Sequence, residues 1–383
     1  MTTEHRPPKL RSPGQTVVLP EEPAQPDGLG DAGQDGSRLR AALGLLHPRR
    51  TSAIYVFIAI FIIFSLWVPS TFLSGTTWKT LLDEQAITAI VAVGLIIPMA
   101  AGAFDLAVGS EVGFGVILVA WLLADKHVAL IPGLALTLLA GALIGVMSGL
   151  LITRVRIDSF IATLGVSSIL TAMTTAVSGG EEVLNLPIRF ENLGSNQLLG
   201  LQYPVYYLIV VAAVAWYVLE RTPIGRRIYA TGGNIEAARL SGINTGRVII
   251  CTLIAGGVIA AAGGALLSAS LDAGDPTVGP SYLLPVLSAA FLGSTQIKPG
   301  RFNVLGTVLA VYVLAAGVKG LELAGAPDWI PDLFNGLALL IAVGVAKTQR
   351  RNVHTSSIRR LVDRSLRRGG DTSAAASGGY QNS

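Results

Sequence analysis

Long apolar stretches separated by short polar connections run through residues 52–348 of this chain. Residues 53–68, 87–101 and 248–271 contain no Asp, Glu, Lys or Arg. About 20 consecutive apolar residues are enough for a helix to cross a bilayer, and a helix satisfies its backbone hydrogen bonds within itself. The pattern therefore predicts an all-α polytopic membrane protein.

The apolar pattern resolves into ten segments, and we expect a transmembrane helix in each. The segments are residues 52–68, 85–101, 105–124, 128–152, 159–178, 203–219, 248–271, 281–293, 302–319 and 329–346. The eighth is short, which favours a tilted or broken helix. Residues 1–51 are rich in Pro, Gly, Asp, Gln and Arg, and residues 349–383 are basic and then rich in Ser, Gly and Ala. We expect both to be disordered tails.

The distribution of basic residues determines the expected orientation. With the N-terminus in the cytoplasm, only four of the 28 Lys and Arg residues fall on the outer side, namely Lys79, Lys126, Arg189 and Lys319. Cytoplasmic loops of membrane proteins are enriched in Lys and Arg. Removing one segment from the count would place basic loops on both sides. We therefore expect ten spans with both termini in the cytoplasm.

Composition excludes several other classes of protein. The chain is 51% hydrophobic and only 14% charged, whereas soluble domains are about a quarter charged. Its net charge of +4 reflects the sidedness of the basic residues and does not indicate nucleic-acid binding. Cys251 is the single cysteine, and the four histidines lack the spacing of metal ligands. We expect no metal, no cofactor and no catalytic residue.

A polar stretch over residues 220–247 interrupts the apolar pattern. It reads ERTPIGRRIYATGGNIEAARLSGINTGR and carries five arginines. A connection between two transmembrane helices needs only a few residues, so the length of this one predicts a docking surface for a cytoplasmic partner. Asn234 is a good N-cap and Gly242 suits the C′ position. These two residues predict a short helix over residues 235–241 that lies across the membrane axis.

The side chains of this short helix fit a docking role. Glu236 lies near the positive end of the helix dipole, and Arg239 lies nearer the negative end. Ala237 and Ala238 keep the helix thin enough to enter a groove, and Ile235 and Leu240 give it an apolar contact. The alternative is an interfacial helix that rests on lipid headgroups, but its apolar face is small for that purpose.

Two acidic residues, Asp105 and Glu111, lie near membrane depth. Only residues 101–103 separate the second and third segments, so we expect a broken helix with Asp105 as the N-cap of the half-helix that follows. Charged groups at membrane depth are expensive unless paired, which makes both residues candidates for a functional role. The alternative to a functional role is a purely structural one, as a helix cap near the cytoplasmic interface. Other segments offer almost no ionisable group, which argues against ion coupling.

Glycines spaced four residues apart predict close helix packing. Gly141, Gly145 and Gly149 share one face of a helix, and Gly109 and Gly113 share a face of another. Small residues let transmembrane helices approach each other closely. We therefore expect a compact bundle and not an open channel.

A faint internal similarity points to a repeated architecture. Residues 105–109 (DLAVG) are similar to residues 275–279 (DPTVG), and the two motifs follow the second and the seventh segment. In the expected topology they lie on opposite sides of the membrane. This is the arrangement of an inverted repeat of segments two to five and seven to ten, with substrate passing at the interface between the repeats.

Four motifs resemble one family of membrane proteins. They are residues 234–243 (NIEAARLSGI), similar to a divergent Glu-Ala-Ala coupling loop; residues 105–110 (DLAVGS), similar to Asp-Leu-Ser-Val-Gly-Ser; residues 157–165 (IDSFIATLG), similar to Pro-Pro-Phe-Ile-Ala-Thr-Leu-Gly; and residues 222–226 (TPIGR), similar to Thr-x-x-Gly-Arg. The family comprises the permease subunits of ribose/xylose/galactose-type (monosaccharide) ATP-binding-cassette (ABC) importers. These are binding-protein-dependent transport system inner membrane components. The resemblance covers nearly all of residues 52–348.

The resemblance implies a type II ABC importer-like bundle, with residues 52–348 as the permease domain and residues 220–247 as its coupling loop. It implies a transport subunit and not an enzyme, in a bacterial inner membrane. ATP would be hydrolysed by separate ATP-binding subunits that dock on Asn234, Glu236, Ala237, Ala238, Arg239 and Gly242. The chain contains no Gly-Lys dipeptide and hence no Walker A loop, which agrees with this division of labour.

The other implied partners are a second permease subunit, identical or not, an extracytoplasmic sugar-binding protein and membrane lipid. No nucleic acid is expected. The matched motifs, together with the acidic residues, indicate candidates for the translocation path: Asp105, Ser110, Glu111, Phe160 and Thr163.

The sequence departs from the family pattern in two places. Asp158 and Ser159 stand where the family has Pro-Pro, and residues 298–304 (KPGRFNV) replace a Gly-Gly-Arg-Gly-Ser-Val segment. The sugar is therefore unspecified. A branched-chain amino acid ABC permease, which shares the architecture, is an alternative. A second is an ion-coupled secondary transporter, which would need more ionisable groups in the membrane. The broken helix argues against a scaffold without a transport role.

Overall fold

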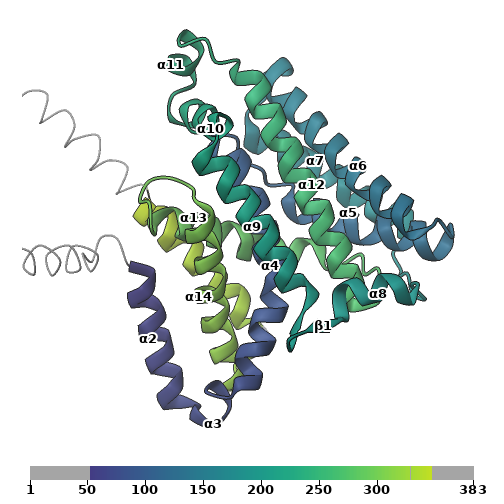
Figure 1. Ribbon diagram of the computed structural model, residues 1–383, viewed down its shortest axis with the longest axis vertical. Coiled ribbons are helices and arrows are strands. Elements are labelled where there is room, and N and C mark those ends of the chain that lie inside the picture. The colour runs from purple at the N-terminus through teal and green to yellow at the C-terminus, as the bar shows by residue number, and fades with distance from the viewer. Residues whose placement is uncertain (1–51, 328, 347–383) are drawn as a thin grey trace, which may run out of the picture. The chain divides into compact units, whose positions relative to one another are not determined.

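A computed structural model describes residues 52–327 and 329–346 of the chain. The two tails predicted as disordered, residues 1–51 and 349–383, lie outside the described residues. The described part is helical apart from its connections and one two-stranded hairpin (Figure 1). The all-α class predicted from the apolar pattern is therefore confirmed.

The first half of the described chain contains the helices α2 (Ser52–Trp67), α3 (Pro69–Phe72), α4 (Gly75–Ala100), α5 (Val108–Ala120), α6 (Leu130–Leu150), α7 (Ser159–Ser178) and α8 (Ile188–Ser195). The π-helical turns η1 (Trp121–Asp125) and η2 (Leu151–Val155) continue α5 and α6. The antiparallel hairpin of β1 (Gln197–Leu198) and β2 (Leu201–Gln202) follows.

The second half contains α9 (Tyr203–Arg221), α10 (Pro223–Gly233), α11 (Ile235–Leu240), α12 (Thr245–Leu271), the 3₁₀ turn η3 (Gly279–Tyr282), α13 (Leu283–Thr295) and α14 (Val304–Leu323). A last apolar helix, Ile330–Ala346, ends the described chain.

Each of the ten apolar segments predicted from the sequence falls on a helix. Seven helices are long and apolar enough to cross a membrane: α4, α5 with η1, α6 with η2, α7, α9, α12 and α14. Three helices in this set are shorter: α2, of which Phe57–Trp67 forms the apolar part, α13 and the helix Ile330–Ala346. The polytopic class is thus supported, while the count of ten spans and the cytoplasmic side of both termini stay predictions.

Polar side chains mark the starts of several helices. Ser74, Thr222, Asn234, Asn244 and Asn303 each accept a hydrogen bond from a backbone N–H in the first turn of the helix that follows. Such an N-cap satisfies one of the four backbone donors that a helix leaves free at its start. These Ser, Thr and Asn side chains therefore help to determine where α4, α10, α11, α12 and α14 begin.

Helix α12 lies at the centre of the packing and contacts α4, α5 and α6. Its closest partner is α6, and the glycine face predicted on α6 forms that contact. A methyl group on Gly141 would collide with the carbonyl of Gly257, and one on Gly145 would collide with the carbonyl of Leu253. Backbone-to-backbone packing of this kind is open only to glycine, which confirms the predicted packing face.

The packing partners of α4 and α12 mirror each other. Helix α12 packs against α5 and α6, whereas α4 packs against α13 and α14. The lengths also correspond, since α4 and α12 have 26 and 27 residues and α5 and α13 have 13 each. Each long helix therefore packs on the short helix of the other half. This exchange supports the predicted inverted repeat.

The two Asp-x-x-Val-Gly motifs were expected on opposite sides of the membrane, but their terminal glycines are in contact, so the ends of both motifs lie at the same depth. The carboxylates of Asp105 and Asp275 each accept a hydrogen bond from the backbone N–H two residues later, at 2.9 and 2.7 Å. At the end of the motifs, Gly109 and Gly279 lie backbone against backbone. A methyl carbon on Gly279 would lie 2.8 Å from the carbonyl oxygen of Gly109, closer than side chains approach. The two similar motifs thus form similar turns, and these turns contact each other through Gly109 and Gly279.

Candidate functional site

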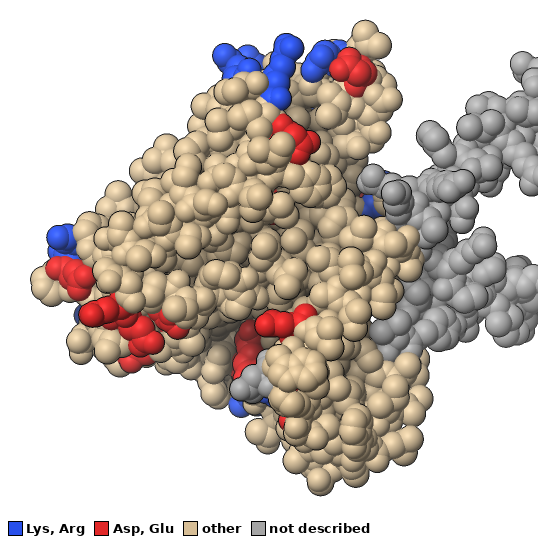
Figure 2. All heavy atoms as spheres, turned by 180° about the vertical axis from the view of Figure 1, so that it is seen from behind, with Lys and Arg blue, Asp and Glu red and all other residues tan. Residues whose placement is uncertain are grey.

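The polar stretch over residues 220–247 folds into two short helices, α10 and α11, which connect α9 to α12 at one end of the bundle (Figure 1). Figure 2 shows Lys and Arg side chains gathered at this same upper end, while most Asp and Glu side chains on that face lie lower. A basic end is typical of the cytoplasmic side of a membrane protein. The stretch therefore presents its helices on the side predicted to be cytoplasmic.

Local capping defines helix α11. The side-chain oxygen of Asn234 accepts a hydrogen bond from the N–H of Ala237 at 3.0 Å. At the other end Gly242 has a φ of +81° and donates its N–H to the carbonyl of Arg239 at 3.0 Å. A positive φ at the C′ position is the reason for glycine there. The predicted N-cap and helix end are both confirmed.

Helix α11 turns much of its surface away from the protein. Leu240 is 89% exposed, and Ile235 is also exposed. Glu236 and Arg239 form an ion pair at 3.5 Å across one turn, with both side chains largely in solvent. Ala238 differs from the prediction, because it is buried against the protein itself. The surface available to a partner therefore consists of Leu240, the Glu236–Arg239 pair and the neighbouring exposed residues.

Helix α10 connects α11 to the membrane helices and was not among the elements predicted from the sequence. Thr222 caps its first turn, and Pro223 occupies the first helical position, where the missing N–H is of no consequence. Thr222 and Pro223 were the signal in the sequence from which the start of α10 could have been predicted. Near the end of α10 a methyl group on Gly232 would collide with the carbonyl of Ala100, the last residue of α4. The backbones of α10 and α4 are therefore in direct contact.

Tyr229 is a second link between α10 and the membrane helices. Its hydroxyl donates a hydrogen bond to the carbonyl of Phe302 at 2.7 Å, and the Arg301 guanidinium lies over its ring at 3.8 Å. Burial, together with the negative charge of Glu220, raises the pKa of Tyr229 to about 12, against the opposing effect of Arg301. The hydroxyl therefore stays protonated as a donor at physiological pH.

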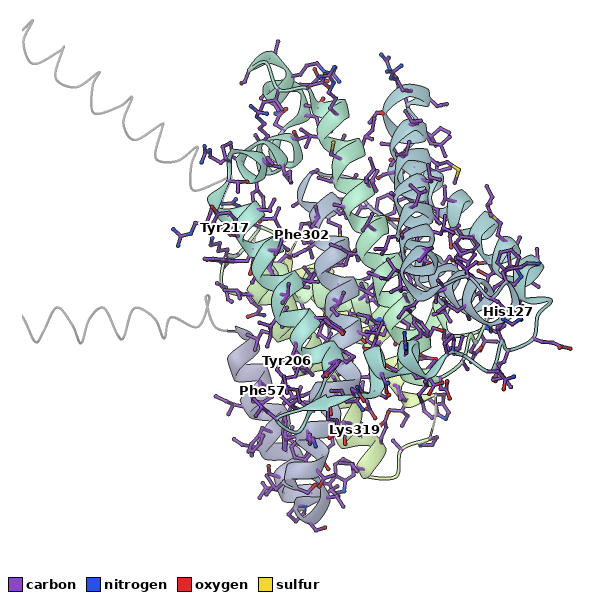
Figure 3. The ribbon with its side chains drawn as sticks, turned by 45° about the vertical axis from the view of Figure 1, so that its right-hand side comes forward. Phe57, His127, Tyr206, Tyr217, Phe302 and Lys319 are labelled. Carbon is purple, nitrogen blue, oxygen red and sulfur yellow. The ribbon has the colours of Figure 1, made fainter. Side chains whose placement is uncertain are left out.

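An aromatic cluster lies behind Tyr229. Phe302, which lies inside the bundle (Figure 3), packs edge-on against Phe291, and Phe291 stacks with Phe104. Phe104 in turn stacks on Phe160 of α7, with ring centroids 4.7 Å apart. A cavity of about 660 Å³ lies between this cluster and α10. The α10–α11 end of the molecule is thus joined to the break between α4 and α5.

The break between α4 and α5 is held by α7. Backbone N–H groups of Phe104 and Leu106 donate to the hydroxyls of Ser159 at 3.3 Å and Thr163 at 3.0 Å. The break is longer than predicted, because α5 begins at Val108 with Ala107 in the N-cap position. Asp105 is therefore not the N-cap, and its carboxylate bonds within the connecting segment instead.

Two further candidates for the translocation path, Ser110 and Glu111, are buried inside the protein, whereas Phe160 is 46% exposed. Ser110 shares a hydrogen bond with Ser167 of α7 at 2.7 Å. Glu111 is 2% exposed, and neither carboxylate oxygen has a hydrogen-bond partner among the described residues. None of Asp105, Ser110, Glu111, Phe160 and Thr163 lines the cavities described here. The structure brings Asp105, Phe160 and Thr163 together as supports of the helix break.

A polar cavity of about 400 Å³ opens among α4, η3, α14 and the helix Ile330–Ala346. Apolar side chains such as Leu81, Val311 and Leu314 form part of its lining, and the polar part combines carboxylate, ammonium, amide, hydroxyl and aromatic groups: Glu84, Gln85, Thr88, Ser281, Tyr282, Lys319, Glu322, Asp332 and Asn335. Lys319 is in the lower half of the molecule, away from the α10–α11 end (Figure 3). This cavity has the mixed polar lining of a small-molecule site.

Charge pairing organises this polar cavity. The Lys319 ammonium lies 3.5 Å from the carboxylates of both Glu84 and Glu322. The sequence contained a signal for this site, because Lys319 was one of four basic residues on the side predicted to be external. The cavity was missed because its lining comes from segments more than 200 residues apart. Among the described residues no group of His, Cys, Asp and Glu could hold a metal ion.

The fold and this site define a class: a membrane permease with a polar cavity towards one end and an exposed helix at the other. The family described as "Branched-chain amino acid transport system / permease component" matches residues 80–343. The chain belongs to this family.

Three relatives show how far the similarity extends. The ribose import permease protein of Haemophilus influenzae is 30% identical over 305 residues, covering 78% of this chain and 92% of that protein. The L-arabinose ABC transporter permease protein of Azospirillum brasilense is 31% identical, with 77% and 86% covered. The xylose transport system permease protein of Escherichia coli is 27% identical, with 78% and 92% covered. No solved structure gives a significant match.

Proposed function

We propose that this chain is the membrane permease subunit of an ABC importer that takes up a monosaccharide. The observation that carries the proposal is its similarity, along most of both chains, to permeases named for ribose, L-arabinose and xylose. These names favour a sugar over the branched-chain amino acid in the family's description. The chain itself carries out transport and no catalysis.

The geometry of α10 and α11 supports a site for ATP-binding subunits. Helix α11 exposes Leu240 and the Glu236–Arg239 pair, and α10 connects it to α4 through the contact of Gly232 with Ala100. A partner that moves α11 would therefore move α10 against the membrane helices. This is the mechanical role that a transport subunit without a Walker A loop requires.

The polar cavity supports a position for part of the sugar path. Carboxylates and amides such as those of Glu84 and Asn335 bind sugar hydroxyls, and the ring of Tyr282 offers a face for the apolar side of a sugar. We place the outer part of the path there. Asp105, Ser110, Phe160 and Thr163 then position the break between α4 and α5 and need not contact the sugar.

The remaining parts of the assembly follow from this proposal. A sugar-binding protein would deliver its ligand to the outer end, where the polar cavity lies, and a second permease subunit would complete the path. The chain would lie in the inner membrane of a bacterium with both termini in the cytoplasm. The basic α10–α11 end supports this orientation.

Uptake by intact cells tests the substrate class. The gene for this chain is deleted from cells that retain its partner proteins, and uptake of labelled ribose, arabinose, xylose and leucine is measured with and without the restored chain. We expect one sugar to depend on the chain, and that uptake to persist when the proton gradient is dissipated while ATP is maintained. Chain-dependent uptake of leucine alone, or loss with the gradient, would overturn the proposal.

Replacement of Leu240 by Asp tests the docking surface. We expect binding of the ATP-binding subunit to weaken by about tenfold or more, because a central apolar contact is lost, while the permease itself stays folded. Leu199→Asp is the matched control, since Leu199 is 92% exposed in the hairpin distant from α11. Equal binding by the L240D and L199D proteins would exclude α11 as the docking site.

A further inference from the structure

An apolar groove of about 600 Å³ runs along the membrane-facing side of the protein between α9 and α12. Both helices pack against α4, and Ile97 of α4 contributes to the floor of the groove. Val210 and Val214 on α9 line one wall and are more than half exposed. Ile259 marks the deep end of the other wall on α12. The groove is thus a furrow that no element of the described chain fills.

Two arginines close one end of this groove. Arg227 of α10 and Arg247 at the start of α12 are the charged residues in its lining. Neither guanidinium makes an ion pair or a side-chain hydrogen bond within the described part of the chain. The acidic residues of this loop are engaged elsewhere, because Glu220 pairs with Lys298 and Glu236 pairs with Arg239.

The dimensions of the groove match one leaflet of a bilayer. From Val248 to Ile259 the α12 wall contains twelve residues, which span about 16 Å at the helical rise. Half of the hydrocarbon core of a bilayer is about 15 Å thick. The arginines lie at the α10 end, where the ends of α9 and α12 and the other basic side chains mark the membrane surface. The apolar groove is therefore about as deep as one leaflet, and it ends at two arginine side chains that form no ion pair among the described residues.

We propose that this groove binds one anionic phospholipid, with an acyl chain between α9 and α12 and its phosphate held by Arg227 and Arg247. Basic pockets between transmembrane helices on the cytoplasmic side suit anionic headgroups, and guanidinium groups bind phosphate oxygens through paired hydrogen bonds. The bound lipid joins α10 to α12 beneath α11. This site is separate from the polar cavity, and its existence does not depend on which solute the protein transports.

The chemistry of the lining excludes a polar solute as the occupant. The walls are valine, isoleucine, leucine and alanine side chains, and the hydroxyl of Thr252 already donates to the carbonyl of Ile249 at 2.8 Å. A sugar would therefore leave its hydroxyls unsatisfied along the groove. Free phosphate would satisfy the arginines but leave the apolar groove empty. A phospholipid and free phosphate therefore predict different results, because only the phospholipid covers the side chains that line the groove.

Cys251 provides a built-in probe of the groove. It is the single cysteine of the chain, it is exposed, and it lines the α12 wall. The full chain is reconstituted in vesicles of phosphatidylcholine alone or with phosphatidylglycerol, and the rate of Cys251 labelling by a membrane-permeant maleimide is measured. We expect phosphatidylglycerol to slow labelling by about tenfold, because two guanidinium groups select the anionic headgroup. Native mass spectrometry should show one phosphatidylglycerol retained per chain.

The double variant R227Q/R247Q should lose most of this protection and the retained lipid. R154Q/R156Q is the matched control, since both arginines are exposed at the end of α6 on the same side, and it should behave as the wild type. Thermal unfolding in detergent checks that both variants are folded. Protection that is equal in the two lipids, that survives in R227Q/R247Q, or that inorganic phosphate in detergent reproduces would overturn the proposal.

Discussion

Helices α10 and α11 are neighbours in one polar loop, but different forces hold them in place. Helix α11 is defined by its own ends, Asn234 and Gly242, and it leaves Leu240 almost wholly in solvent. Helix α10 is defined by what it touches, because Gly232 packs on α4 and Tyr229 bonds to Phe302. Helix α11 thus exposes most of its surface, whereas α10 is anchored to the membrane helices; we propose that α11 binds a partner and that α10 transmits the partner's movement.

The difference shows how a short loop can both bind and transmit. A docking helix must stay exposed, so local capping has to supply the order that burial supplies elsewhere. A connecting helix must move with the membrane helices, so it needs direct contacts with them. Substitutions in the two helices should therefore have opposite profiles: a change in α10 affects folding, and a change on the surface of α11 affects partner binding.

The largest effect is expected from Gly232→Val in α10. The valine side chain would have to occupy the space of the Ala100 carbonyl, and overpacking of this kind costs about 3 kcal/mol. We expect a marked fall in the midpoint of thermal unfolding in detergent and little folded protein in the membrane. Gly233→Val is the matched control, because no atom lies near its added methyl group. Equal stability of the two variants would show that α10 does not contact α4 as described.

Tyr229→Phe should have an intermediate effect. The change keeps the ring under Arg301 and removes the hydrogen bond to the Phe302 carbonyl, leaving that acceptor unsatisfied at a cost of about 1–2 kcal/mol. We expect a lower unfolding midpoint and weaker coupling of ATP hydrolysis to transport. Tyr217→Phe, at an exposed position on α9, is the control. A coupling ratio unchanged by Y229F would remove this contact from the transmission path.

The smallest effect on global stability is expected from Asn234→Ala in α11. Loss of an N-cap costs about 1 kcal/mol, but α11 has only six residues and few contacts to propagate the change. We expect an almost unchanged unfolding midpoint, faster amide hydrogen exchange confined to α11, and weaker binding of the ATP-binding subunit. Asn234→Asp, which retains the cap, should restore all three properties. Unfolding of the whole protein by N234A would contradict the independence of α11.

Several features could be predicted because their causes are local. The apolar segments predicted helices, since a helix needs only its own backbone to satisfy its hydrogen bonds in a membrane. The spacing of Gly141 and Gly145 predicted a packing face, and the basic loops predicted one side for α10 and α11. The N-cap at Asn234 could also be predicted, because its hydrogen-bond partner, the N–H of Ala237, lies only three residues away.

Other features could not be predicted because their parts are distant in the chain. Asp105 was expected to cap α5, but the turn needed more residues, and Ser159 and Thr163 of α7 hold it instead. Ala238 was assigned to a partner surface and is buried within the chain. The polar cavity combines Glu84 with Lys319, which no local pattern connects.

By itself the sequence determined the helical membrane class, the short capped helix α11 and the glycine faces, because each depends on residues within a turn or two of one another. Tertiary structure alone decided which backbone each glycine faces, how α10 joins α11 to α4, and where polar groups gather into a cavity. Those outcomes depend on which helices pack together. In a membrane, where hydrophobicity does not distinguish one helix from another, shape and hydrogen bonds make that choice.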